Sequence, residues 1–433
     1  MSASSDQQTH SAGVERALGV QTQRPTILVL MAYYLPAFKA GGPVRSISGL
    51  VAALGDKFEF KIVCGDRDLN DSKPFPGEPS GCWYKYDNAQ VMRLKSNVSG
   101  VLEILRVLRR EKCELVYINS VFTRIYSMLP MALRALGLVP KRPVIVAPRG
   151  EFSAGALGIK PGRKRLWLAM AKSMGLFRSV IWQASSEHEK NDILRVLGTV
   201  HVRMASVIHR PQAGDTAASV LEGGVVVARD VAEVVRFRAP LGSGGPKIPG
   251  TLRIATLGRV CRMKNIDYAI RLFRNIRGSV TYDIYGPLED VKYVEICRDI
   301  CKELPENVKV RLMGGIPHHD VQPTLAGYHL FLLPTLGENF GHVVVEAMAA
   351  GCAVLLSDRT PWRALHDAGV GWDLPLSEPK RFAEAIVSAL DWNDEEFHQI
   401  SNLAHEYAKR IDTYAISVQE NEALFRVALA RVE

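Results

Sequence analysis

The sequence contains no segment that is long and apolar enough to cross a lipid bilayer as a helix. Such a helix needs about 18 or more consecutive apolar residues, and the best stretch, Tyr126 to Pro140, is interrupted by Arg134. Residues 1–24 are polar and lack the apolar core of a secretory signal. We therefore expect a disordered leader over residues 1–24 and a cytoplasmic location.

Cysteine is scarce and forms no recognisable pattern. The seven cysteines include no C-x-x-C pair, and Cys297 and Cys301 have no matching Cys or His pair nearby. These features argue against a disulfide framework and against a structural zinc site. We expect reduced and mostly buried thiols.

Acidic residues are fewer than basic ones, 45 against 54, which gives a net charge of +9. The excess is concentrated between Lys141 and Arg178, where nine basic residues accompany one acid, Glu151, and Trp167 lies among them. This segment is either an amphipathic surface that rests on anionic lipid or a solvated helix with its apolar face on the core. We expect no nucleic-acid partner, because the basic residues are not interleaved with stacking aromatic residues.

Short apolar runs rich in β-branched residues alternate with helical patterns in two stretches of the chain. This alternation predicts βαβ units and a parallel sheet in each stretch. The predicted strands are residues 26–31, 58–63, 115–118, 144–147, 252–257, 280–285, 308–313, 330–333 and 353–357.

The chain therefore divides into two doubly wound α/β domains. Small residues and the run G-S-G-G-P mark a linker between them. Two such domains place a ligand in the cleft between them, at the carboxyl ends of the strands. The predicted parts after the leader are an N-terminal Rossmann-like domain (25–210), an irregular linker (211–250), a C-terminal Rossmann-like domain (251–410) and a C-terminal helix (411–433).

The strongest chemical signal is T-L-G-E-N-F-G-H-V-V-V-E at residues 335–346, a loop that leads from a predicted strand into a helix. Gly341 allows a ligand to approach the backbone where the helix begins. Free N–H groups and the positive end of the helix dipole bind phosphate there. These N–H groups belong to His342, Val343 and Val344. Glu346 is suited to accept hydrogen bonds from a ribose and Glu338 from sugar hydroxyls, although two such acids alone would be a weak signal.

A second loop between a strand and a helix is L-G-R-V-C-R-M-K-N at residues 257–265. Arg259 offers a planar guanidinium and Lys264 a mobile ammonium, and together they can neutralise a diphosphate leaving group. A lone loop cation is usually a solvated charge. Two such loops in equivalent positions of successive β–loop–α units point to one shared site.

The pair G-R-x₄-K-N and E-N-F-G-x₄-E resembles the donor site of the family-four retaining glycosyltransferases, and P-R-G-E at residues 148–151 resembles a segment of bacterial members that build surface polysaccharide. The resemblance implies the GT-B fold, with two Rossmann-like domains facing a central cleft. It implies that Arg259 and Lys264 bind the donor diphosphate, that Glu338 contacts the transferred sugar and that Glu346 binds the ribose. Asn339, Phe340 and Gly341 complete this loop.

The N-terminal half carries weaker parts of the same resemblance. Gly41-Gly42 before a helix resembles the family's glycine loop that faces the donor phosphate, although such a turn can also be only a turn. Arg149, in the segment P-R-G-E, is an acceptor-side candidate or a paired structural arginine. Many members carry a His after an early strand, where this chain has Asn119 and Ser120, which cannot titrate near neutral pH.

Two further motifs suggest metal ligands but lack support. Asp66-Arg67-Asp68 matches the metal-binding D-x-D of a different glycosyltransferase fold, and His318-His319-Asp320 has no third ligand placed by the sequence. We expect no metal site and no cofactor other than the nucleotide-diphosphate sugar, which is a substrate.

The expected function is a retaining, metal-independent hexosyltransferase of exopolysaccharide or lipopolysaccharide biosynthesis. Its partners would be a nucleotide sugar, a polysaccharide or lipid-linked oligosaccharide acceptor, and an anionic membrane surface on the inner membrane face. Two alternatives remain: a sugar-nucleotide epimerase of the GT-B fold, which needs acid–base groups near the sugar, and a non-enzymatic basic binding protein.

Overall fold

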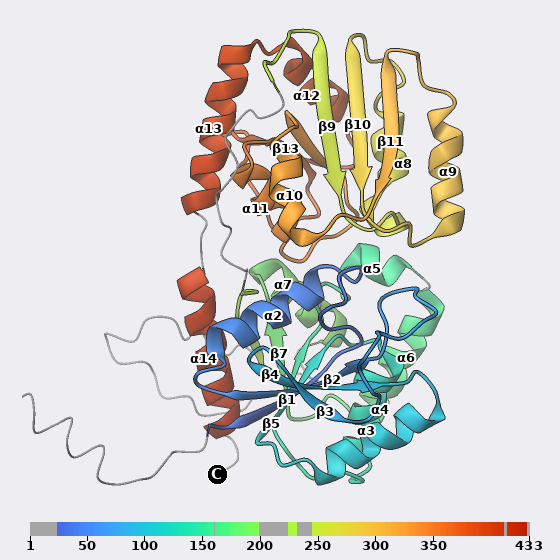
Figure 1. The fold of residues 1–433 in the computed structure, drawn as a ribbon, viewed down its shortest axis with the longest axis vertical. Coiled ribbons are helices and arrows are strands. Elements are labelled where there is room, and N and C mark those ends of the chain that lie inside the picture. Colours follow the sequence, from blue (N-terminus) through green and yellow to red (C-terminus); the bar gives the residue numbers. More distant parts are fainter. Residues whose placement is uncertain (1–23, 160, 199–223, 232–244, 411–413, 431–433) are drawn as a thin grey trace, which may run out of the picture.

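The computed structural model describes residues 24–159, 161–198, 224–231, 245–410 and 414–430, which form two α/β domains (Figure 1). Each domain contains a largely parallel sheet with helices on both faces, as the alternating pattern predicts. Among the described residues, no helix is long and apolar enough to span a membrane.

The N-terminal sheet has eight strands in the order β3-β4-β2-β1-β5-β6-β7-β8. All neighbours are parallel except β3, which pairs antiparallel with β4 at one edge. Its central strands are continuous apolar runs because both faces of a parallel sheet are buried. The strands are β1 (Thr26–Leu30), β2 (Glu59–Gly65), β3 (Trp83–Tyr86), β4 (Ala89–Leu94), β5 (Leu115–Asn119), β6 (Val144–Ala147), β7 (Val180–Ala184) and β8 (Val225–Val227).

The helices of this domain cover the two faces of its sheet unequally. One face packs against α2, and the other against α3, α4, α6 and α7. The helical segments are α2 (Gly42–Leu54), α3 (Val98–Arg110), the π-helical turn η1 (Arg124–Met128), α4 (Leu129–Ala135), α5 (Ala154–Gly158), α6 (Pro161–Ser173) and α7 (Glu187–Leu197).

The C-terminal sheet has six parallel strands in the order β11-β10-β9-β12-β13-β14. The strands are β9 (Thr251–Leu257), β10 (Ser279–Tyr285), β11 (Val308–Gly314), β12 (Leu330–Leu333), β13 (Ala353–Ser357) and β14 (Gly371–Leu374). The helical segments are η2 (Arg262–Lys264), α8 (Ile266–Arg271), α9 (Val291–Cys301), α10 (His318–Leu325), α11 (His342–Ala349), α12 (Pro379–Asp391) and α13 (Asp394–Arg410).

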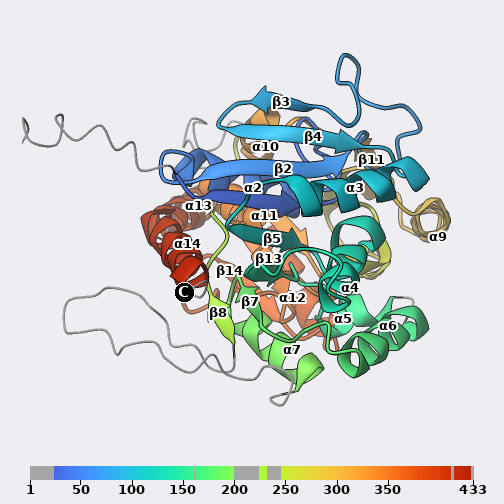
Figure 2. The ribbon, with the colours of Figure 1, turned by 90° about the horizontal axis from the view of Figure 1, so that it is seen from below.

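The last helix, α14 (Tyr414–Leu429), returns to the N-terminal domain, while α13 lies beside the C-terminal sheet (Figure 1). Phe425 of α14 packs edge-on against Phe58 and Tyr117, with ring centroids 5.4 and 6.0 Å apart. The view from below places α14 and α6 on opposite sides of the molecule (Figure 2). The final helix therefore completes the face of the N-terminal sheet that α2 covers only in part.

The structure differs from the sequence-based expectation in three places. Residues 225–227, inside the expected linker 211–250, form β8, because three successive valines suit the edge position beside β7. The C-terminal helix expected over residues 411–433 is shorter in the described part, where α14 spans Tyr414–Leu429, and residues 411–413 and 431–433 lie outside that part. The hairpin strands β3 and β4, together with β7, β14 and α10, were not predicted.

Candidate functional site

The two loops that carry the predicted donor-site residues lie against each other in the C-terminal domain. We call residues 257–265 the first loop and residues 334–341 the second loop. The backbone N–H of Leu336 donates to the carbonyl of Met263 at 2.9 Å. The Thr335 hydroxyl donates to the same carbonyl at 2.9 Å. Because both loops follow parallel strands, they meet at the carboxyl edge of the sheet.

Each cation of the first loop is paired with a carboxylate. The Lys264 ammonium donates to the Glu338 carboxylate, so two predicted catalytic groups are in direct contact. Both side chains are largely shielded, with 14% and 18% of their surfaces exposed. Arg259 is more open and donates to Glu289 at 2.7 Å.

Gly341 fixes the turn from the second loop into α11. Its φ of 80° is left-handed, a conformation that side chains other than glycine adopt at a cost. A Cβ atom at this position would lie 3.1 Å from Glu338 Cγ and 3.2 Å from Trp362 Nε1. Glycine is therefore required both by the backbone and by the packing around Glu338.

The start of α11 exposes fewer N–H groups than the sequence suggests. The N–H of Val344 donates to the Gly341 carbonyl at 2.8 Å, so the expectation that it is free is wrong. Within the described part of the chain, the backbone N–H groups of His342 and Val343 donate to no protein acceptor, and no side chain caps the helix. These two groups and the helix dipole remain suited to an anion.

Asn339 and Phe340 hold the second loop in place from two sides. The Trp362 indole N–H donates to the Phe340 carbonyl at 2.7 Å, inside the C-terminal domain. The Asn339 amide is oriented so that its nitrogen meets acceptors and its oxygen meets a donor. In this orientation Asn339 donates to Glu189 at 2.7 Å and contacts the Ser185 hydroxyl at 2.8 Å. The loop that carries Glu338 is thus bonded directly to the N-terminal domain.

The domains also meet at the predicted ribose-binding residue. Arg45, in the first turns of α2, donates to Glu346 Oε1 at 2.5 Å across the cleft. Glu346 is buried, and its Oε2 has no hydrogen-bond partner among the described residues. His318 Nδ1 lies 3.5 Å from the same Oε1. One oxygen of this carboxylate is therefore paired, while the other is buried and lacks a donor among the described residues.

His342 is a largely shielded, neutral side chain beside this pair. Burial lowers its pKa to about 3, and the charges of Arg45 and Arg149 act in the same direction. Its Nε2 lacks a hydrogen-bond partner among the described residues and lies 3.9 Å from Asp230 Oδ2. A neutral imidazole in this position can donate or accept one hydrogen bond without adding charge.

The acceptor-side candidates form a buried network. Arg149, only 6% exposed, pairs with Asp230 and donates to Asn119 Oδ1 at 2.8 Å and to the Tyr117 hydroxyl at 2.6 Å. The Asn119 amide in turn donates to the Pro43 carbonyl at 3.4 Å. These contacts fit the paired structural arginine that the sequence left open as an alternative.

Ser120 is oriented by a buried acid. Its hydroxyl donates to Glu151 at 2.9 Å, and its φ of 119° is unusual for serine. Burial raises the pKa of Glu151, and hydrogen bonds from Val121, Ser120 and Phe122 oppose that shift. Ser120 is thus committed to a structural contact within its own domain.

The glycine pair at the start of α2 borders open space. Gly41 has a φ of 72° and precedes the helix, in which Pro43 occupies the first turn. A Cβ atom at Gly41 or at Gly42 would meet nothing within 4 Å. The helix start therefore offers room for a ligand beside Arg45.

The residues of the two proposed metal motifs have structural partners. Asp68 accepts from the backbone N–H groups of Phe38 and Lys39 at 2.9 and 3.2 Å, and Asp66 pairs with Arg67. Over the described ranges, no group of three or more His, Cys, Asp or Glu residues is close enough together to hold a metal ion.

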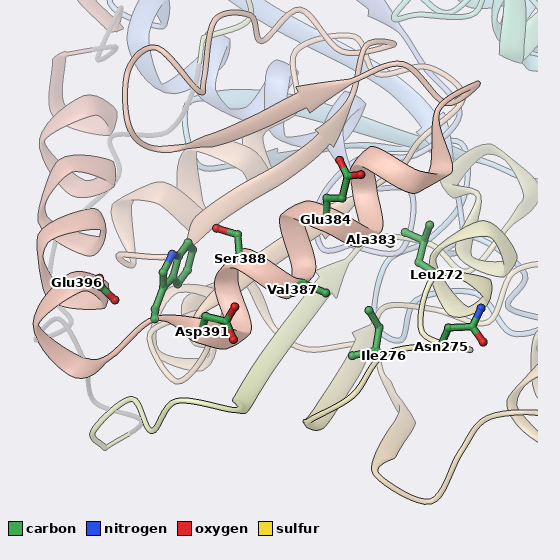
Figure 3. A pocket seen from close by; sticks show the side chains of 10 residues that line it. Leu272, Asn275, Ile276, Ala383, Glu384, Val387, Ser388, Asp391 and Glu396 are labelled. Carbon is green, nitrogen blue, oxygen red and sulfur yellow. The ribbon is translucent and has the colours of Figure 1, made fainter.

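A wide groove of about 800 Å³ lies at the other end of the C-terminal domain (Figure 3). It borders α12 and the chain just before β10, at the amino ends of the strands. Its lining includes Glu384, Asp391 and Glu396 and no Lys or Arg. Such a lining does not suit a diphosphate, so the cleft between the domains is the better candidate site.

Three residues of the cleft were missed by the sequence analysis: Arg45, Glu189 and Asp230. Arg45 could have been found as a cation three positions after the Gly41-Gly42 pair. Glu189 and Asp230 carry no local signal, because their partners come from distant parts of the chain.

Comparisons with known proteins find their family match in the domain that contains the two loops. Residues 246–409 match the family model described as Glycosyl transferases group 1. An 83-residue stretch is 34% identical to a phosphatidyl-myo-inositol mannosyltransferase of Mycobacterium leprae, covering 19% of this chain and 22% of that protein. A 149-residue stretch is 28% identical to an uncharacterized glycosyltransferase of Methanocaldococcus jannaschii, covering 33% and 37%. The matches thus span well under half the length of these relatives.

Solved structures match over nearly the whole chain. Sucrose-phosphate synthase from Thermosynechococcus elongatus superposes with a TM-score of 0.69 at 15% identity, covering 94% of this chain and all of that one. The Anabaena protein HepE, solved with UDP and glucose, gives 0.63 at 15% identity, covering 93% and 100%. The described chain therefore has the GT-B fold, and its residues 246–409 are similar to the group 1 glycosyl transferases.

Proposed function

We propose that this protein is a retaining glycosyltransferase that moves a hexosyl group from a nucleotide-diphosphate sugar to a glycan acceptor. The observation that carries the proposal is the contact of the two loops, which brings Lys264 onto Glu338 beside the open start of α11. The group 1 match over residues 246–409 supports it, as does the likeness to HepE, whose structure contains UDP and glucose.

The donor would bind across the carboxyl edge of the C-terminal sheet. Arg259 and Lys264 would exchange their carboxylate partners for the diphosphate, which the N–H groups of His342 and Val343 also contact. Glu338, released from Lys264, would accept hydrogen bonds from sugar hydroxyls. Cations held in place before the reaction stabilise the negative charge that develops on the leaving diphosphate.

The acceptor hydroxyl would attack the anomeric carbon from the face that the diphosphate leaves. The bond from this carbon to the phosphate oxygen breaks as the new glycosidic bond forms, and the acceptor proton moves to the departing phosphate. Asn119 and Ser120 cannot titrate near neutral pH and are already bonded to Arg149 and Glu151. This favours the leaving group as the base, with the protein supplying position and charge.

The experiment that tests this proposal is donor hydrolysis without acceptor. Purified protein is incubated with UDP-, GDP- and ADP-sugars, without and with added divalent metal, and nucleotide release is measured. We expect one donor to be consumed without metal, and Glu338→Ala and Arg259→Ala/Lys264→Ala to reduce the rate by about 100-fold or more. The matched control is Arg298→Ala/Lys302→Ala, which removes one exposed cation from α9 and another from the residue that follows this helix.

The stereochemical outcome separates the remaining alternatives. A product with the anomeric configuration of the donor supports retention, and an inverted product refutes it. If the nucleotide sugar returns as its epimer with no nucleotide released, the epimerase alternative replaces the transferase. Failure of the intact protein to bind or consume any donor would refute the proposed function.

We further propose that the acceptor is presented at an anionic membrane. Around α6, one surface combines exposed apolar and basic side chains, although Trp167 and Leu168 of the same helix face the core. Arg134 of α4 donates to the Arg178 carbonyl, which joins this surface to the end of α4. We call it the basic apolar face; its exposed members are Leu136, Leu138, Arg163, Arg165, Leu166, Met170, Met174 and Arg178.

Apolar side chains flanked by arginines suit the boundary between lipid headgroups and acyl chains. The lysines of the segment contribute less: Lys172 donates to the Val196 carbonyl, and Lys160 lies outside the described residues. We expect binding to vesicles that contain phosphatidylglycerol, weakened by Leu166→Ser/Met170→Ser and by salt, and unchanged by Leu403→Ser on α13. Equal binding by the wild type and the double variant would refute this assignment.

A further inference from the structure

The cleft contains one ion pair that joins the domains at the proposed ribose site. Arg45 comes from α2 of the N-terminal domain and Glu346 from α11 of the C-terminal domain, 301 positions apart in the chain. Their contact is short, 2.5 Å, and 26% of the Arg45 side chain but only 9% of Glu346 is exposed. The pair is therefore shielded from solvent, where charge-assisted hydrogen bonds count most.

The pair uses only half of the Glu346 carboxylate. Arg45 donates to Oε1, whereas Oε2 is buried without a hydrogen-bond partner among the described residues. A buried carboxylate oxygen without a donor is unfavourable. A hydroxyl of a ligand would supply the hydrogen-bond donor that Glu346 Oε2 lacks within the described part of the chain.

The position of Arg45 along α2 supports a role toward the ligand. It lies three positions after Gly42, where the space around the glycine pair is open. An arginine that served only to hold the domains together would not need to stand beside this opening. Two nearby contacts already serve that purpose, because Asn339 binds Glu189 and Ser185.

We propose that Arg45 is a positioning residue for ribose recognition. By holding Oε1, it keeps the Glu346 carboxylate turned so that Oε2 accepts a hydrogen bond from a ribose hydroxyl of the donor. This inference rests on the proposed function, since it assumes that a nucleotide occupies the cleft. It goes beyond the proposed function in one respect. Ribose selectivity would depend on a residue of the opposite domain, so the ribose site is complete only when the two domains are in contact.

The test measures selectivity for the ribose rather than activity alone. Equilibrium binding of UDP, GDP and ADP and of their 2′,3′-dideoxy counterparts is measured for the wild type, Arg45→Ala, Arg45→Lys and Glu346→Gln. We expect the wild type to prefer the ribose form of its nucleotide by about 10- to 100-fold, the range of one to two hydrogen bonds to a charged group. Arg45→Ala should bring the ratio close to one, and Arg45→Lys should restore part of it.

Two further variants separate positioning from general damage. Arg45→Ala/Glu346→Gln should lose no more selectivity than either single variant, because both act on one interaction. Arg229→Ala removes a similar pair, with Glu420 at 2.7 Å and side chains 39% and 9% exposed, and should keep the wild-type ratio. If Arg45→Ala also keeps it, the positioning role is refuted while the proposed function stands. If the wild type binds none of the nucleotides, the proposed function itself fails.

Discussion

Gly341→Ala should impair the donor site by more than its effect on stability explains. At this position the backbone is left-handed, with φ of 80°, and the added methyl group would touch Glu338 Cγ at 3.1 Å and Trp362 Nε1 at 3.2 Å. Carbon atoms rarely approach so closely, so Glu338 must move by a few tenths of an ångström. Lys264 is bonded to the Glu338 carboxylate and would move with it.

The backbone part of this effect can be measured separately. An alanine in the left-handed region costs about 1–2 kcal/mol, which corresponds to a melting-temperature decrease of about 2–4 °C per kcal/mol for a domain of this size. Gly250 has nearly the same φ, 76°, and a Cβ there would meet nothing within 4 Å. Gly250→Ala therefore reproduces the backbone strain without the crowding, at a turn far from the cleft.

The assay pairs thermal melting with nucleotide release from the donor. Both variants should lose a similar amount of thermal stability, but only Gly341→Ala should lose donor hydrolysis, by about 10-fold or more, since displacements below 1 Å at a catalytic group have effects of this size. If the two variants keep equal activity at a temperature where both are folded, then Glu338 is not held by packing against Gly341. The reasoning about the second loop would then be wrong.

Two other substitutions test the supports of the cleft, and a third tests a buried histidine inside the C-terminal domain. Asn339→Asp places a carboxylate against Glu189 and should raise the donor KM by about 10-fold through repulsion. Asn339→Ala only removes the contact and should have a smaller effect. Equal KM values for the two variants would contradict the contact. Trp362→Phe removes one hydrogen bond to the second loop and should lower stability by about 1 kcal/mol, measured by melting. Trp167→Phe is the comparison, because the indole N–H of Trp167 has no partner among the described residues. An unchanged melting temperature of Trp362→Phe would contradict the hydrogen bond. Burial lowers the pKa of His329 from 6.5 to about 3, so the unfolded chain binds the extra proton and stability falls as pH drops below 6.5. Between about pH 7 and 5, the free energy of unfolding of His329→Gln should fall by about 2 kcal/mol less than that of the wild type. The melting temperature of the variant should therefore depend less on pH. An unchanged pH dependence would contradict that pKa.

Much of the fold was predictable because its strands are local, continuous apolar runs. The predicted strand 26–31 matches β1, and the predicted strand 115–118 lies within β5, since strands buried on both faces need no alternating pattern. The edge strand β3 was missed because W-Y-K-Y is only half-buried and resembles a polar loop. The docking of α14 on the N-terminal sheet was also beyond a local pattern, because Phe425 finds its partners hundreds of positions away.

Some residues of the candidate site could be predicted from local sequence, and others could not. Arg259, Lys264, Glu338 and Gly341 stand in loops whose spacing and neighbouring strands identify them, and the structure brings Lys264 and Glu338 into contact. Their roles toward a ligand remain predictions. The contacts of Arg45 and other cleft residues from the N-terminal domain depend on how the two domains face each other, which no sequence window contains.

The charges of the cleft are best understood as pairs rather than as single residues. Lys264 with Glu338 and Arg45 with Glu346 are both shielded, so removing one member leaves the other as an unpaired charge. Part of any loss caused by an alanine variant is then the penalty of that unpaired charge and not the lost interaction with substrate. Double variants and charge-conserving variants distinguish the two, because only a group that contacts the donor affects catalysis after its partner has also been removed. On this argument, comparing Lys264→Ala with Lys264→Ala/Glu338→Gln is more informative about the diphosphate than either single variant.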